Sequence, residues 1–288
     1  MDGEVRHPLL RWLIFGHVWV ALAVAAQILW TTLFLHEGTL ARRYALAAFL
    51  GSFAAYGVLR LARTDGPEGT EYENLLWYRA NRKLMLVLVG LAGLAACLLL
   101  GPLWTIVWPM MVPAVVLTFF YVTPFTSSKG RGIGLRTVPF LKAVLIAVLW
   151  AIVTVAVPLR LDPIGHSDFS ILALTCMRVP LILSLAILFD VRDRGSDGPA
   201  LRTVPIVFGT KGAKRIALFF LLCSALFEFL FLRGLGYVAA SWTILVGYAF
   251  GVVLAVRAKP VRDPVYYGIF VDGVMIAIPL CVWAGTVF

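Results

Sequence analysis

The sequence predicts an all-α integral membrane protein, a single domain over residues 1–288 that forms a bundle of about nine transmembrane helices with a cytoplasmic N-terminus. Hydrophobic residues make up 61% of the chain and charged residues 14%, whereas a soluble globular domain carries about 25% charged residues. The apolar residues gather in blocks of about 20, the length at which a helix crosses roughly 30 Å of hydrocarbon. Continuous apolar runs such as residues 84–100 do not alternate as the strands of a closed barrel would.

Nine apolar segments divide the chain. We expect spans at about 12–35, 42–60, 84–101, 103–122, 138–158, 170–190, 214–232, 235–256 and 267–287. The separations at Gly101-Pro102 and at residues 233–236 are the weakest, because only a short turn rich in Gly or Pro marks them. The first segment is too long for a cleavable signal peptide and lacks a small-residue cleavage site, so we interpret it as the first span.

The basic residues follow the expected membrane topology. Of the 25 Lys and Arg residues, 20 fall in segments predicted to be cytoplasmic and four on the opposite side, while Arg178 falls inside a span. Cytoplasmic loops of membrane proteins carry this excess of positive charge, so the net charge of +10 needs no nucleic-acid partner. A multi-pass protein of a bacterial inner (cytoplasmic) membrane is the simplest interpretation, and an organellar membrane of the same polarity fits as well.

Three long cytoplasmic connections, at about 61–83, 123–137 and 191–213, are the predicted place of function. Because all three lie on one side of the membrane, they can contribute to one site. Asp65 and Glu68 belong to the first connection, and Lys129 belongs to the second.

The third connection begins with an acidic stripe. Asp190, Asp193 and Asp197 stand at i, i+3 and i+7, on one face of a helix that Gly195 and Gly198-Pro199 should end. Clustered carboxylates suit Mg²⁺, which binds through one or two carboxylates plus substrate phosphates. The alternative is a solvated loop of mixed charge. Basic residues of the same connection can contact a phosphate: Arg192, Arg194 and Arg202.

Ionisable residues also lie inside predicted spans, where a charge costs a few kcal/mol unless it finds a partner. Each is a functional candidate, and ion pairing between helices is the structural alternative. They are Lys142, Arg178, Glu228 and Asp272.

The acidic stripe and the residues after it resemble a known motif. Asp190-x-x-Asp193-x-x-x-Asp197, followed by Gly198, Thr203-Val204-Pro205 and Gly209, is similar to the second aspartate motif of the UbiA superfamily of intramembrane prenyltransferases. Tyr121-x-x-Pro124 with Lys129 resembles the Y-x-x-P-x-K stretch of that family. The expected nine helices and the place of the stripe after the sixth span agree, so the resemblance covers nearly the whole chain.

This resemblance implies a fold and an activity. Members join a prenyl diphosphate to an acceptor, often an aromatic ring, inside a helical bundle that opens sideways to lipid. It implies that Asp190, Asp193 and Asp197 are catalytic and hold Mg²⁺ against the diphosphate, which Lys129 and Tyr121 help to bind. Arg194 is a further candidate for binding the diphosphate.

One departure from the family concerns its first motif, N-D-x-x-D-x-x-x-D, which should fall near residues 56–63. This stretch contains no acidic residue. Asp65 and Glu68 are the nearest carboxylates and are further candidate metal ligands, beyond the end of the predicted helix. Arg60 and Arg63 stand in the stretch instead, and they either bind the diphosphate directly in place of one Mg²⁺ or simply end the span.

The sequence thus predicts a membrane prenyltransferase that transfers a prenyl group from a prenyl diphosphate to an aromatic or lipid acceptor. Its expected partners are the diphosphate, a lipid-soluble acceptor and membrane lipid, without nucleic acid. One alternative is a non-catalytic UbiA-like protein that binds a polyprenyl lipid or acts as a scaffold. Another is a transporter whose pathway is lined by the ionisable residues within the spans.

Overall fold

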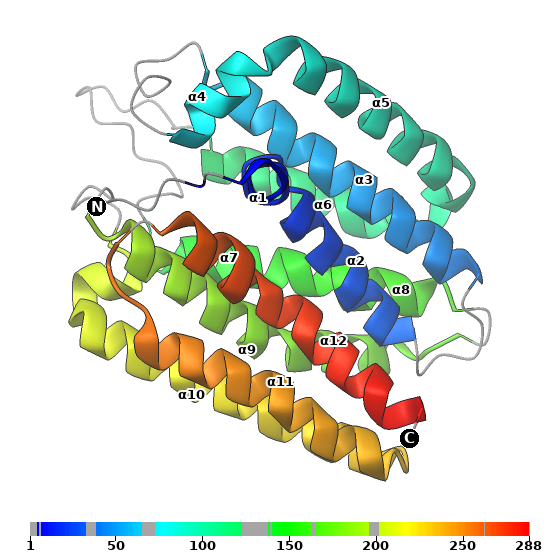
Figure 1. Cartoon of the computed structure of the whole chain (residues 1–288). Coiled ribbons are helices and arrows are strands. Elements are labelled where there is room, and N and C mark those ends of the chain that lie inside the picture. The colour runs from blue at the N-terminus through cyan, green and yellow to red at the C-terminus, as the bar shows by residue number, and fades with distance from the viewer. Residues whose placement is uncertain are drawn as a thin grey trace.

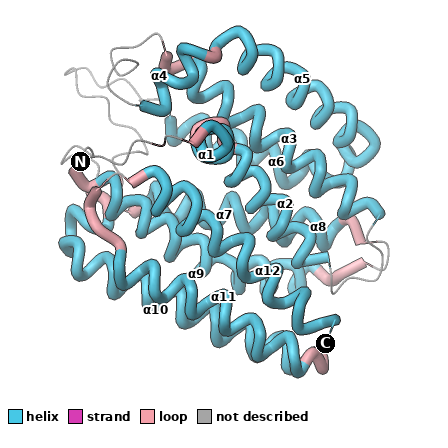
Figure 2. Tube along the Cα trace, in the orientation of Figure 1, coloured by secondary structure: helices cyan, strands magenta, loops and turns pink. Residues whose placement is uncertain are grey.

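Every regular element in the described part of the chain is a helix (Figures 1 and 2). The computed structural model describes residues 5, 7–32, 39–64, 73–122, 138, 140–162, 165–195, 202–261 and 263–287, with the backbone alone at 113–115 and 117–122. Over these residues the predicted all-α class is confirmed.

The chain order of the elements is given in Figure 1. The helices are α1 (Pro8–Ile14), α2 (Val18–Thr32), α3 (Thr39–Leu61), α4 (Glu73–Ala80), α5 (Arg82–Leu100), α6 (Trp104–Val122), α7 (Leu141–Ala151), α8 (Val157–Arg160), α9 (Asp168–Asp193), α10 (Val204–Gly234), α11 (Val238–Arg257) and α12 (Asp272–Val287). A 3-10 turn, η2 (Gly101–Leu103), separates α5 from α6. Two π-helical segments precede α8 and α12, namely η4 (Ile152–Ala156) and η6 (Tyr266–Val271).

Seven helical stretches among the described residues are long and apolar enough to cross a membrane, or eight if α1 and α2, bent by 56°, form one broken span. One of the seven is Arg82–Val112, which η2 divides where the sequence predicts a separation. In Figure 1 the chain turns after α5, and α6 runs back behind α3. The multi-pass membrane architecture is confirmed, while the number of nine spans and the cytoplasmic N-terminus stay predictions.

Large apolar side chains cover the outward faces of the helices. Leu98 of α5 is 68% exposed and Phe219 of α10 is 62% exposed. Val246 of α11 is also exposed. A soluble monomer rarely leaves so much apolar surface in water, whereas in a bilayer these faces meet hydrocarbon and only the helices' own hydrogen bonds satisfy the backbone.

The helices pack in a continuous order around the bundle. α9 lies between α7 and α10, α10 contacts α11, and α11 contacts α12. α12 packs on α2, which packs on α3, which packs on α5 (Figure 1). The largest apolar core lies among α9, α10, α11 and α12, and a smaller one lies among α2, α3 and α5.

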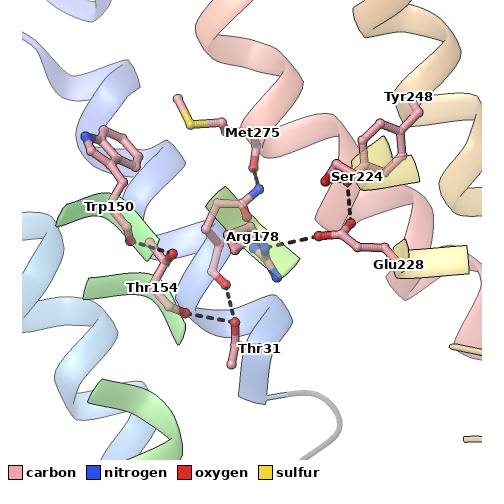
Figure 3. A network of polar contacts seen from close by, with 9 residues as sticks. Thr31, Trp150, Thr154, Arg178, Ser224, Glu228, Tyr248 and Met275 are labelled. Atoms are coloured by element: carbon pink, nitrogen blue, oxygen red, sulfur yellow. Dashed lines mark hydrogen bonds and ion pairs between the residues drawn. The ribbon is translucent and has the colours of Figure 1, made fainter. Parts of the chain in front are cut away.

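A buried network of polar contacts, centred on one ion pair, connects five helices (Figure 3). Arg178 Nε of α9 lies 3.1 Å from Glu228 Oε1 of α10, and the two residues are 4% and 1% exposed. The Tyr248 hydroxyl of α11 donates to Glu228 Oε2 at 2.6 Å. Arg178 Nη1 donates to Gln27 of α2, whose amide donates to the Met275 carbonyl of α12 at 2.7 Å. Interhelical pairing of these two in-span charges is therefore confirmed.

Several helix boundaries differ from those that the sequence suggests. The first predicted span breaks between α1 and α2 at His17, whose φ is 58°. The predicted connection at 191–213 is too long, because α10 already begins at Val204: Pro205 suits the first turn of a helix, and Gly209 takes a left-handed φ of 68° at a kink within α10. The predicted connection at 61–83 contains α4.

Gly247 provides a test of how α11 packs on α12. A Cβ at Gly247 would lie 2.9 Å from the Ile278 Cα. We expect Gly247→Ala to lower the thermal unfolding temperature in detergent, because the backbone cannot move aside and overpacking costs about 1–3 kcal/mol. The control is Gly90→Ala on α5, where a Cβ would meet nothing within 4 Å. Equal unfolding temperatures for Gly247→Ala and the unchanged protein would contradict this packing.

Candidate functional site

One end of the bundle, which we call the basic end, is where α3, α9 and α11 finish and α5, α7 and α10 begin. Alternating helix directions place at this end the described helix ends that flank the three connections predicted to be cytoplasmic (Figure 1). The described side chains that build the candidate site come from the ends of α2, α3, α7, α9 and α12: His17, Arg60, Arg63, Lys142, Asp190, Arg192, Asp193 and Asp272.

The first pair at the basic end joins α7 to α9. Lys142 Nζ lies 2.7 Å from Asp190 Oδ1, and the Asp190 side chain is 3% exposed against 28% for Lys142. A buried carboxylate is costly unless it is paired. Lys142 supplies that pairing, and Asp190 is in turn the partner that the in-span ammonium needs.

The second pair lies within the last turn of α9. Arg192 Nε and Nη2 donate to the two carboxylate oxygens of Asp193, both at 2.8 Å. The guanidinium also lies 4.7 Å from the Phe189 ring centroid and 5.7 Å from that of Tyr267. Asp272 attracts Arg192 electrostatically as well, so Arg192 is held by two carboxylates and two rings.

Arg60, in the last turn of α3, has a different environment. Its Nε donates to His17 Nε2 at 3.2 Å, and the His17 ring stacks on Tyr56 with centroids 5.1 Å apart. His17 reaches this place because it stands at the bend between α1 and α2. Within the described residues, the two terminal amino groups of Arg60 have no hydrogen-bond partner.

Tyr78 of α4 adds a hydroxyl beside Arg60. The Tyr78 side chain is fully buried, and its hydroxyl has no hydrogen-bond partner among the residues that the structure describes. Burial raises the pKa of Tyr78 to about 12, although the positive charge of Arg60 acts the other way. The phenol therefore keeps its proton at neutral pH and can donate it to an anion.

Positive charges repel one another around Arg60. Arg63 and Arg192 are both close enough to act on Arg60 electrostatically. An arrangement of this kind favours an anion, and an unpaired guanidinium fork suits the oxygens of a phosphate.

The described carboxylates do not by themselves fit a Mg²⁺ site. In the described ranges no group of three His, Cys, Asp or Glu side chains could hold a metal ion. Asp190 is paired with Lys142, and Asp193 with Arg192. The other predicted ligands lie outside the described residues, so the Mg²⁺ site stays a prediction: Asp197, Asp65 and Glu68.

The remaining predicted site residues are spread over the same end. Lys129 lies outside the described residues, and Tyr121 is described only by its backbone, in the last turn of α6. Arg194 Nη1 donates to Thr210 Oγ1 at 2.7 Å, which joins the end of α9 to the kinked start of α10. The predicted end of the acidic helix near Gly195 is confirmed, because α9 finishes at Asp193.

Sequence reasoning missed His17 and Tyr78. His17 is one of four histidines spread over the sequence, and Tyr78 lies in the predicted connection at 61–83. Gly16 could have indicated the bend at His17, because a Gly within a helical pattern weakens the prediction of an unbroken helix. A break at that point turns the start of α2 toward the end of α3.

Comparison with solved structures identifies this arrangement. A structure described as the apo structure of a UbiA homolog from Aeropyrum pernix K1 matches with a TM-score of 0.59 and 15% sequence identity, over 94% of this chain and 97% of that chain. The chain has the UbiA fold. No protein-family model matches the sequence, and no curated protein matches it.

The UbiA fold confirms what the resemblance predicted about architecture. It brings the end of α3 and the end of α9, the expected positions of the two motifs, within electrostatic range of each other. In this chain the α3 end presents Arg60 to Arg192 of α9, in place of an acidic motif facing an acidic motif.

The Lys142–Asp190 pair can be tested within the UbiA fold by a double-mutant cycle. Lys142→Met should destabilise the protein by about 3 kcal/mol, at the low end for breaking a buried pair, because Lys142 is partly exposed. Lys142→Met combined with Asp190→Leu should recover most of that loss. Stability is measured as thermal or denaturant unfolding in detergent, and an unchanged Lys142→Met variant would contradict the pair.

Proposed function

We propose that this protein is a membrane prenyltransferase that binds the diphosphate of its prenyl donor at the basic end and transfers the prenyl group to a lipid-soluble acceptor. The observation that carries the proposal is the environment of Arg60. Its Nε is fixed by His17, while its two terminal amino groups have no partner among the described residues.

The electrostatics around Arg60 favour a diphosphate as the ligand. Arg63 raises the local positive potential, and the neutral Tyr78 hydroxyl offers one more donor. When the bond between the allylic carbon and the bridging oxygen breaks, negative charge grows on the leaving diphosphate. Cations already fixed in position stabilise that charge without rearrangement.

An apolar groove supports a prenyl chain as the other part of the donor. It has a volume of about 360 Å³ and lies among α2, α3 and α5, with Val18, Phe49, Phe53 and Leu88 in its wall. Phe49, Phe53 and Arg60 share one face of α3, at i, i+4 and i+11. Val18 adjoins His17, so a diphosphate on Arg60 can continue directly into a chain in this groove.

In this proposal, Mg²⁺ binds only to residues of the acidic stripe. When bound, it would neutralise phosphate oxygens, and Asp193 with Asp197 are the residues proposed to hold it. Arg60 and Arg63 supply positive charge without it, which gives direct cationic binding the larger share of diphosphate affinity in our proposal.

A second candidate is a non-catalytic protein that binds prenyl diphosphates. The pairing of Asp190 with Lys142 and of Asp193 with Arg192 favours it, because both carboxylates already have cationic partners. The two candidates share the binding step and differ in whether diphosphate is released.

Binding and transfer are tested with radiolabelled geranyl and farnesyl diphosphates on protein in lipid nanodiscs. Arg60→Gln should weaken binding by about 10- to 100-fold, because charge-assisted hydrogen bonds are lost while Gln can still reach His17. Arg257→Gln, a loss of charge at the end of α11 of the same bundle end, is the matched control and should bind normally.

Adding a lipid extract then separates the two candidates. Transfer predicts released diphosphate together with a prenylated lipid detected by mass spectrometry. Binding without release would support the non-catalytic protein, and equal affinities for Arg60→Gln and Arg257→Gln would remove Arg60 from the site.

Chelation tests how the diphosphate is held. In excess EDTA, we expect at least about a tenth of the affinity to remain, since cationic side chains bind phosphate without metal. Asp193→Asn should raise this metal-free affinity by releasing Arg192. Binding that disappears in EDTA and returns only with MgCl₂ would show that carboxylates hold the diphosphate through metal, against the proposal.

A further inference from the structure

A second polar site lies away from the basic end, in the half of the bundle where α2 and α10 finish and α9 begins. It is a cavity of about 240 Å³. Arg178 and Glu228 line it, as do Trp30, Met177, Ser170 and Leu235. Of the described residues, neither Asp190 and Asp193 nor the arginines of the basic end belong to its lining.

The walls of this cavity are mostly apolar. Leu174, Met177 and Phe231 belong to its lining, and Leu235 at its edge is 48% exposed. Trp30 contributes a flat indole, and the guanidinium of Arg178 lies 3.4 Å from its ring centroid. A ligand that fits must therefore be largely apolar, and the volume suits a molecule of one or two rings.

The guanidinium of Arg178 has hydrogen-bond donors that no described residue uses. Arg178 uses Nε on Glu228 and Nη1 on Gln27, whereas its Nη2 has no hydrogen-bond partner in the part of the chain that the structure describes. Glu228 Oε2 accepts a hydrogen bond from Tyr248, whereas Oε1 lies in the ion pair with Arg178 and accepts no hydrogen bond from the described residues. Arg178 thus offers the N–H groups of its Nη2 at the wall of a mostly apolar cavity, and such donors call for an acceptor oxygen.

The net charge of the Arg178–Glu228 pair determines whether a charged or a neutral oxygen fits. Arg178 and Glu228 neutralise each other, and both are almost fully buried. A carboxylate in the cavity would leave a net negative charge at that depth, which is costly in a membrane interior. A neutral carbonyl accepts the same hydrogen bond and leaves the balance unchanged.

We propose that this cavity binds a neutral, lipid-soluble carbonyl compound, with its oxygen on Arg178 and its apolar body between Trp30 and Met177. A π-helical segment in one wall of the cavity supports the proposal. η4 supplies Val155 to the lining, and the carbonyl of Thr154 within η4 accepts from Thr31 Oγ1 at 2.8 Å (Figure 3). π-Helical segments of this kind occur frequently at functional sites.

This ligand is distinct from the two substrates of the proposed transfer. Arg178 and Asp190 are separated along α9 by about 18 Å at 1.5 Å per residue. A molecule held on Arg178 is too far from the basic end to meet a prenyl group there. Binding in this cavity is therefore independent of the proposed prenyl transfer.

Photolabelling with benzophenone tests the site. Benzophenone is a neutral aryl ketone whose excited carbonyl inserts into nearby C–H bonds, those of Met side chains in particular, so peptide mass spectrometry should find the label on Met177. Three competitors of similar shape then read out the chemistry: acetophenone, its isostere α-methylstyrene, in which a CH₂ replaces the oxygen, and benzoate.

Acetophenone should suppress labelling of Met177 at a concentration about tenfold lower than α-methylstyrene, because only acetophenone accepts the hydrogen bond of Arg178. Equal potency of the two would show that the cavity selects shape alone and would overturn the proposal. Suppression by benzoate at the lowest concentration would overturn it in favour of an anion site, and so would absence of label on Met177.

Two variants locate the effect. Leu235→Trp should fill the edge of the cavity and abolish the label while leaving geranyl diphosphate binding intact. Arg178→Met combined with Glu228→Met removes both charges, so acetophenone and α-methylstyrene should become equal competitors. Unchanged labelling of Leu235→Trp would place the ketone outside this cavity, and this variant decides the matter even if the double variant does not fold.

Discussion

The ion pair between Arg178 and Glu228 is the constraint on which the bundle depends. Either charge alone would be costly at that depth, so each requires the other in one geometry. Because hydrocarbon does not favour one face of an apolar helix over another, close packing and polar contacts between helices fix its rotation. The pair fixes α9 against α10, and the hydrogen bonds of Gln27 and Tyr248 extend this to α2, α11 and α12.

The fixed rotation of α9 and α2 determines which side chains meet at the basic end. With α9 held at Arg178, its last turn presents Asp190 to Lys142 and Arg192 to Asp272. α2 is held through Gln27, and the bend before it delivers His17 to Arg60. Asp190 and Asp193 of α9 are paired with Lys142 and Arg192. The terminal amino groups of Arg60, in contrast, have no hydrogen-bond partner among the described residues and can bind a ligand. The end of α3 is therefore positively charged, whereas a pair of acidic motifs would make it negatively charged.

The sequence predicted the class of fold because apolar blocks long enough to span a bilayer have few other solutions. It also identified Lys142, Arg178 and Glu228 as charges in need of partners, but it could not supply the partners. Helices that are apolar on every side carry no periodicity that reveals which face turns inward. Asp190 was expected to bind metal because of its spacing from Asp193 and Asp197 and the resemblance to the aspartate motif, and its pairing with Lys142 became visible only when α7 and α9 were side by side. His17 was missed for a related reason, since its role depends on a bend that hydropathy does not register.

The central claim is that cationic side chains, with Arg60 foremost, hold the diphosphate at the basic end. An experimental structure with bound geranyl thiolodiphosphate, which resists cleavage, tests it most directly. We predict that phosphate oxygens lie within hydrogen-bond distance of the terminal amino groups of Arg60, with the geranyl chain along Phe53 and Phe49. A diphosphate found on the carboxylates of Asp190 and Asp193 through bridging metal, with Arg60 out of contact, would contradict the account.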